Sequence, residues 1–261
     1  MQEPVTSPPS PSALRFGKTL KFAIRESWDA LGLLCAASLT LFIVGAGPIY
    51  LAFHSLLLGA AVLVFVLAPF LAGACLLAHR VYMHDEPSYL DLWYGYRRLL
   101  PASIAVGIVQ ALGIGALLAN VLFYSSRGGF GFLVLSVAFI YLLIFWLMNC
   151  LYHFPLLIAA DQRIVVREDE GPARLRSVFR NAFLLAVSSP GYSFAVLAFI
   201  MAVEVPLIAS GVGLALIGMA LPAFVSTRAA RDHLIRLAMI PPDPDPDEPL
   251  AEEMWKLPGR Q

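Results

Sequence analysis

One acidic residue, Glu204, lies by itself in a long apolar run that extends from Phe199 to Ile208. An ionisable group inside a lipid bilayer is costly, so it usually faces a cavity or a partner and marks a functional site. Two residues later, Pro206 has no backbone N–H and frees the carbonyl of Ala202, and helix breaks of this kind line transporter sites. Glu204 is therefore a candidate intramembrane functional residue.

The position of the nearest turn decides whether Glu204 meets lipid or water. A turn at Glu204-Val205-Pro206 would leave the carboxylate in external water, where it has no special role. The motif Ser210-Gly211-Val212-Gly213 has the better turn chemistry and would keep Glu204 inside the membrane. Both interpretations remain open at the level of the sequence.

The other distinctive residues favour packing over chemistry. Gly107, Ala111 and Gly115 recur every four residues, and small residues at this spacing let helices approach closely, either within one chain or between subunits. Three amides inside apolar runs are expected to form interhelical hydrogen bonds: Gln110, Asn120 and Asn149. Three widely spaced cysteines are expected to be small buried hydrophobic residues, with neither a disulfide nor a zinc site: Cys35, Cys75 and Cys150.

A cluster of ligand-type side chains at His79, His84, Asp85 and Glu86 does not have the spacing of a metal site. Histidines five residues apart lie on different faces of a helix, so we expect a solvated helix end capped by Asp85. The sequence shows no glycine-rich phosphate loop and no nucleophile elbow. We therefore expect no enzyme and no cofactor, and a membrane-embedded enzyme ranks third among the functions considered.

The distribution of charge indicates the element that must position these residues. The chain has 261 residues, of which 59% are hydrophobic and 14% charged, whereas a soluble domain carries about 25% charged residues. Long segments have no Asp, Glu, Lys or Arg: 30–79, 99–126, 128–160, 181–203 and 205–227. A bilayer is crossed by about 20 apolar helical residues. The pattern predicts an all-α, polytopic membrane protein, and its neutral total charge gives no reason to expect nucleic acid as a partner.

Six spans fit the basic residues best. Seventeen of the eighteen Lys and Arg residues then lie on one side, and Arg127 is the exception. Cytoplasmic loops retain positive charge, so an even count with both termini in the cytoplasm is predicted, in a bacterial cytoplasmic membrane. The predicted spans lie near 29–47, 56–82, 101–123, 131–154, 190–209 and 214–232.

Three amphipathic segments are expected to lie in the cytoplasmic interface: a basic helix from Ala13 to Trp28, then 85–100 and 172–189. A shift of the sequence by 85 residues aligns the segment 85–100 with the segment 172–189. This indicates either a degenerate internal repeat or two helices that independently satisfy the same requirements of the membrane interface. The helical membrane domain covers 13–236. Proline-rich tails at 1–12 and 237–261 are predicted to be disordered.

The order of motifs resembles the YesL-like bacterial membrane proteins, a family of unknown function. The motifs are Glu86-Pro87-Ser88, followed by aromatic residues from Leu92 to Arg97, then Tyr152 to Leu156 and Asn181 to Leu185. The resemblance covers roughly residues 25–235. It implies a multi-span protein often encoded beside carbohydrate-uptake genes, and it supplies no catalytic residues.

The expected function is a non-enzymatic accessory or regulatory component of a bacterial solute-uptake system, with carbohydrate as one such solute. The expected partners are the lipid bilayer and either a membrane permease or further copies of this chain. The alternative is a small self-contained transporter or channel that uses Glu204.

Overall fold

The computed structural model describes residues 16–83, 86–162, 172–237 and 239–240, and this part of the chain is helical and contains no strand. The all-α prediction is confirmed. The elements are α1 (Phe16–Asp29), α2 (Leu31–His54), α3 (Leu56–Tyr82), α4 (Leu90–Ser125), α5 (Phe130–Asp161), α6 (Pro172–Ser188), α7 (Pro190–Ser210), a π-helical turn η1 (Leu214–Gly218) and α8 (Leu221–Arg236). The predicted N-terminal tail and the start of the predicted N-terminal helix lie outside the described residues, as do 238 and 241–261 of the predicted C-terminal tail. Within that predicted tail, Ile240 packs against the hydrophobic core, so the tail begins later than predicted.

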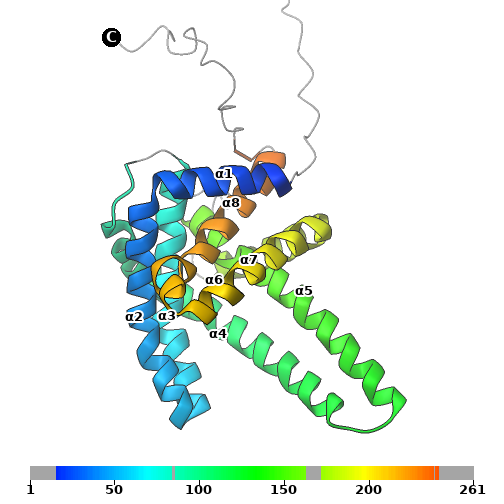
Figure 1. Ribbon diagram of the computed structural model, residues 1–261. Helices are drawn as coiled ribbons and strands as arrows, with labels where there is room; N and C mark the ends of the chain where they lie inside the picture. The colour runs from blue at the N-terminus through cyan, green and yellow to red at the C-terminus, as the bar shows by residue number, and fades with distance from the viewer. Residues whose placement is uncertain (1–15, 84–85, 163–171, 238, 241–261) are drawn as a thin grey trace, which may run out of the picture.

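Among the described residues, five helices are long and apolar enough to cross a membrane: α2, α3, α4, α5 and α7. The chain is thus a multi-span membrane protein. Figure 1 shows α1 and the end of α8 at one end of the molecule, with the turns after α2 and after α4 at the opposite end. This arrangement places both ends of the helical domain on the same side. The assignment of that side to the cytoplasm stays a prediction.

The first predicted span is longer than expected. We placed its end near 47 and a turn from Gly45 to Ser55, but α2 continues through Pro48 to His54, and Ser55 alone separates it from α3. The side chain of Ser55 accepts a hydrogen bond from the backbone of Leu58, at 3.4 Å, and so caps α3. The expected turn is wrong because neighbouring helices allow a membrane helix to continue through a proline.

The segment 85–100 is not a separate interfacial helix, because it is continuous with the third predicted span in the 36-residue helix α4, which passes through Pro101. The carboxylate of Asp91 accepts a hydrogen bond from the backbone N–H of Ser88 at 2.9 Å and so caps the start of this helix. The same Asp91 pairs with Arg80 of α3 at 2.7 Å. The segment 172–189, in contrast, forms a distinct helix, α6, so the two halves of the 85-residue shift are built differently.

Helices α3 and α4 cross at two glycines that the sequence analysis did not single out. A Cβ added to Gly95 would lie 2.7 Å from the Cα of Gly73, and a Cβ on Gly73 would overlap the carbonyl oxygen of Leu92. Only glycine at these positions allows the two backbones to touch. This crossing fixes α4 against the centre of the molecule.

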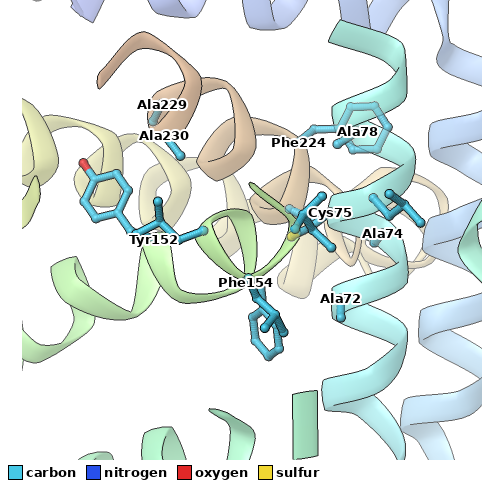
Figure 2. Packing of buried hydrophobic residues seen from close by; sticks show 14 of the residues in the cluster. Ala72, Ala74, Cys75, Ala78, Tyr152, Phe154, Phe224, Ala229 and Ala230 are labelled. Atoms are coloured by element: carbon cyan, nitrogen blue, oxygen red, sulfur yellow. The ribbon is translucent and has the colours of Figure 1, made fainter. Parts of the chain in front are cut away.

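The core surrounds α3. Figure 2 shows its small side chains Ala72, Ala74, Cys75 and Ala78 along the cyan helix at the right of the view, with Phe224 of α8 next to Ala78. Tyr82, one turn further along α3, donates a hydrogen bond to the backbone carbonyl of Phe224 at 3.0 Å. The tight packing around small residues explains how the short helix α8 is held beside longer ones.

The sixth predicted span, 214–232, is not one continuous helix. The chain forms η1, breaks at Met219 and Ala220, and resumes as α8. Ser38 of α2 satisfies the break, since its hydroxyl donates to the carbonyl of Ile217 at 2.7 Å and accepts from the N–H of Ala220 at 3.0 Å. Pro222, at the start of α8, has no N–H to continue the preceding helix.

The break lies at membrane depth. Its partner Ser38 is inside the span α2, and the side chain of Met219 lies 3.5 Å from the Cβ position of Gly45, further along the same helix. In Figure 1, η1 lies beside α2, short of the end of the α2–α3 hairpin. Irregular backbone at this depth is tolerated where it is buried in protein or lines a water-filled cavity.

Candidate functional site

Glu204 lies on α7, six residues before its end at Ser210, and faces η1. The turn after α7 is at Gly211, which has a φ of 64°, so of the two turns considered the Ser210–Gly213 motif is correct and Glu204 is inside the helix. A Cβ on Gly218 would lie 3.1 Å from Oε2 of Glu204. The carboxylate therefore rests against the backbone of the π-helical turn, where a larger residue would displace it.

The carboxylate of Glu204 has no partner in the described part of the chain. Its Oε1 atom is buried and makes no hydrogen bond with the described residues, and no described cation pairs with it. The residue as a whole is partly buried. A partly desolvated charge without a partner is costly, so the group is suited to bind a proton or a cation. Helix α7 continues through Pro206, so the break near Glu204 is the one that follows η1 and not one at the proline. A functional role for Glu204 stays a prediction.

The predicted small-residue stripe divides into two parts. Gly107 is buried on α4, and a Cβ at this position would lie 2.7 Å from the Cβ of Ala68 on α3. Ala111 and Gly115 are exposed, and no atom lies within 4 Å of a Cβ placed on Gly115. Gly107 therefore packs within the chain, whereas the other two present an open, flat surface.

The three intramembrane amides have different environments. Gln110 of α4 donates to the carbonyl of Cys150 on α5 at 3.3 Å, so the predicted interhelical bond is confirmed there. Asn120 donates to the carbonyl of Ala116 in its own helix at 2.8 Å, so it does not link helices through this bond. Asn149 is buried on α5, and its Oδ1 atom makes no hydrogen bond with the described residues.

The histidine cluster at the end of α3 is only partly visible. His84 and Asp85, including the predicted cap, lie outside the described residues. Among those that are described, no group of three His, Cys, Asp or Glu side chains is placed to hold a metal ion.

A buried polar cluster between α1 and α8 was missed by the sequence analysis. Arg228 of α8 has a side chain only 4% exposed and lies 3.6 Å from Glu26 of α1 and 3.2 Å from Asp232. Its guanidinium also lies over the rings of Phe22 and Tyr82, with centroids 4.7 and 5.8 Å away. We call Glu26, Arg228 and Asp232 the α1–α8 clamp.

Hydroxyl groups extend the clamp towards α7. Thr19 of α1 donates to Asp232, and Tyr192 of α7 reaches the same carboxylate at 3.3 Å. Tyr152 of α5 contacts His233 at 3.3 Å and Ser193 at 2.7 Å. The rings of Tyr192 and His233, with centroids 5.2 Å apart, bring the two sets of hydrogen bonds together, so four helices meet at the clamp.

His233 is uncharged in this cluster. It lies on α8, outside the five spans, and burial, with a smaller effect from the positive charge of Arg236, lowers its pKa to about 4. A neutral imidazole can accept the hydroxyl hydrogen of Tyr152, which fits a structural role near neutral pH.

The sequence contained one usable signal for the clamp. Arg228 and Asp232 are four residues apart, the spacing of an ion pair on one helix face. In the sequence Arg228 counts only as one of the seventeen basic residues expected on the cytoplasmic side, because its partner Glu26 is far away in the chain. The face that α1 turns towards α8 is accordingly polar, with Thr19 and Ser27 buried and Trp28 71% exposed.

Comparison with known proteins adds no assignment. The chain matches no family model, no curated protein and no solved structure. The resemblance to the YesL-like proteins stays a prediction.

Proposed function

We propose that this protein is a non-enzymatic accessory subunit of a solute-uptake system in a bacterial cytoplasmic membrane, with both termini in the cytoplasm, and that it docks laterally on a membrane-embedded permease. The observation that carries the proposal is the exposure of the hairpin formed by the end of α4 and the start of α5. Between Leu112 and Leu142, Ser136 is the only buried residue. We call residues 112–142 the α4–α5 arm.

The arm offers the features that helices use to associate in lipid. In Figure 1 it diverges from α2 and α3, so that most of its surface is available to neighbours. Apolar exposure alone fits lipid equally well, but the open positions Ala111 and Gly115 also allow a second helix to approach closely. A partner helix is the occupant that would make use of that flat face.

Photocrosslinking in native membranes tests this proposal. A crosslinking amino acid at Leu118, which is 44% exposed on the arm, should give an adduct with a second integral membrane protein. The same label at Ile43, which is 64% exposed on α2, is the matched control and should react with lipid. Adducts with lipid alone at Leu118 would contradict the proposal.

Steric substitution provides the second arm of the experiment. Gly115→Leu should abolish recovery of the adduct from Leu118, because the bulky side chain occupies the open face. Gly32→Leu is the control, since Gly32 is a helical glycine of α2 that also has no atom within 4 Å of its Cβ position. Equal loss of the adduct in both variants would show a general effect on the fold and would remove the support for a docking face.

The second candidate function is a small self-contained transporter, favoured by the unpartnered Glu204 beside the break at η1. Solute or ion flux by the purified chain in liposomes, lost in Glu204→Gln, would support it. Absence of flux for protons and monovalent cations would argue against it.

A further inference from the structure

Helix α5 carries three buried polar atoms without hydrogen-bond partners in the described part of the chain. They are Nε1 of Trp146, Oδ1 of Asn149 and Nε2 of His153. Asn149 is 4% exposed and His153 is fully buried. Each group lies within the span α5, where an unsatisfied polar atom costs on the order of several kcal/mol. Three such atoms within eight residues of one helix require an explanation.

The three side chains lie on one face of α5, because their spacings of three and four residues follow the helical repeat. The rings of Trp146 and His153 are in contact, with centroids 6.2 Å apart. Opposite them, a Cβ on Gly113 of α4 would lie 2.6 Å from Nε1 of Trp146, so the indole nitrogen faces the backbone of α4. Phe179 of α6 covers His153, with ring centroids 4.6 Å apart.

The contact with Gln110 of α4 determines which ring nitrogen of His153 carries the proton. The side-chain nitrogen of Gln110 donates to the carbonyl of Cys150, and this fixes the orientation of the amide, since a carbonyl only accepts. The same nitrogen lies 3.1 Å from Nδ1 of His153, which therefore accepts. In the neutral imidazole the proton is then on Nε2, and Nε2–H is a donor without a partner.

The unpartnered groups thus comprise two donors, from Trp146 and His153, and one acceptor, from Asn149. A hydroxyl group has the complementary pattern, with two lone pairs and one O–H. A carboxylate has no hydrogen to donate to Asn149, and an ammonium group cannot accept from either N–H. An apolar lipid tail satisfies none of the three.

We propose that the seam between α4 and α5 is a binding site for a hydroxyl-bearing guest, either ordered water or a small polyol, held by Trp146, Asn149 and His153. The site is separate from Glu204 and from the arm, and it does not depend on the proposed docking function. The bound guest supplies the hydrogen bonds that the three side chains lack within the membrane.

NMR of the full chain in lipid nanodiscs, with ¹⁵N in the Trp and His side chains, tests the site. Magnetisation transfer from water should reach the indole N–H of Trp146 and Nε2–H of His153, and His153 should show the Nε2–H tautomer. Trp146→Phe and His153→Gln assign the two signals. Trp28, which is exposed, provides the solvent reference.

Substitution of the acceptor separates a specific site from general hydration. Asn149→Leu should abolish transfer to both N–H groups, whereas Asn120→Leu should leave it unchanged, because Asn120 bonds within its own helix. If Asn149→Leu does not fold, Trp146→Phe removes a single donor and should still reduce transfer to His153. Unchanged transfer in the folded variants would overturn the proposal.

Glycerol distinguishes the two guests. Saturable shifts of both N–H signals with glycerol, together with loss of the water transfer, would identify a polyol site. No shift with glycerol and persistent water transfer would identify a water site. Neither water transfer nor glycerol shifts would show a dry seam and would contradict the proposal.

Discussion

Two glycines and one proline lie close to Glu204 in the structure. Gly211 ends α7 with a positive φ, Gly218 lets the carboxylate rest against η1, and Pro206 lies within the same helix. The residue itself was predictable because a carboxylate in an apolar run is conspicuous in any sequence. Its partnerless oxygen was not predictable, since this depends on where η1 packs.

If Glu204 is kept for function at a cost in stability, its replacement by an apolar residue should stabilise the protein. We expect Glu204→Gln to keep the thermal midpoint of the wild type, and Glu204→Leu to raise it, because leucine removes a partly buried carboxylate that has no described partner. Val205→Leu, at the exposed neighbour, is the control and should be neutral. A Glu204→Leu variant much less stable than wild type would instead indicate a structural carboxylate. Thermal unfolding in detergent measures all three.

Arg228 should be among the residues most sensitive to replacement. Arg228→Leu removes the guanidinium that lies between Glu26 and Asp232, and breaking a buried ion pair costs about 3–5 kcal/mol. We expect a lower thermal midpoint and faster tryptic cleavage within α1, which loses its attachment to α8. Arg176→Leu on the exposed face of α6 is the control. Equal cleavage of α1 in both variants would show that the clamp does not hold it.

At the scale of the elements, composition predicted where helices are and tertiary contacts decided where they end. The amphipathic pattern of 172–189 was correct, with Val178 and Ala182 buried and Arg176 and Arg180 exposed on α6. The break after η1 was not predictable, because it is satisfied by Ser38, a residue of α2 far away in the sequence.

The crossing of α3 and α4 predicts opposite effects for one type of substitution. Gly73→Ala should destabilise the protein, because the new methyl group overlaps the carbonyl oxygen of Leu92. Gly115→Ala should be neutral or stabilising by up to about 1 kcal/mol, because alanine favours a helix and meets no atom within 4 Å. Thermal unfolding of both variants provides the comparison. Equal effects would show that the backbones do not touch at Gly73.

At the scale of the whole molecule, charge and geometry agree on an arrangement with both ends on one side. All Lys and Arg residues except Arg127 lie in the segments that the predicted topology places on one side of the membrane. Figure 1 shows α1 and the end of α8 together at one end of the molecule, opposite the turns that follow α2 and α4. The number of continuous spans was less predictable than this arrangement. The last segment returns through η1 and α8, and its intramembrane break could not be inferred from apolar length.

The membrane topology tests the central claim most directly. Single cysteines at positions 97, 127 and 176, in a chain that lacks Cys35, Cys75 and Cys150, are exposed to a membrane-impermeant thiol reagent in intact cells. Because basic loops are retained in the cytoplasm, we predict labelling at position 127 alone, with 97 and 176 reacting only after the cells are opened. Labelling of position 97 or 176 from outside would contradict the account.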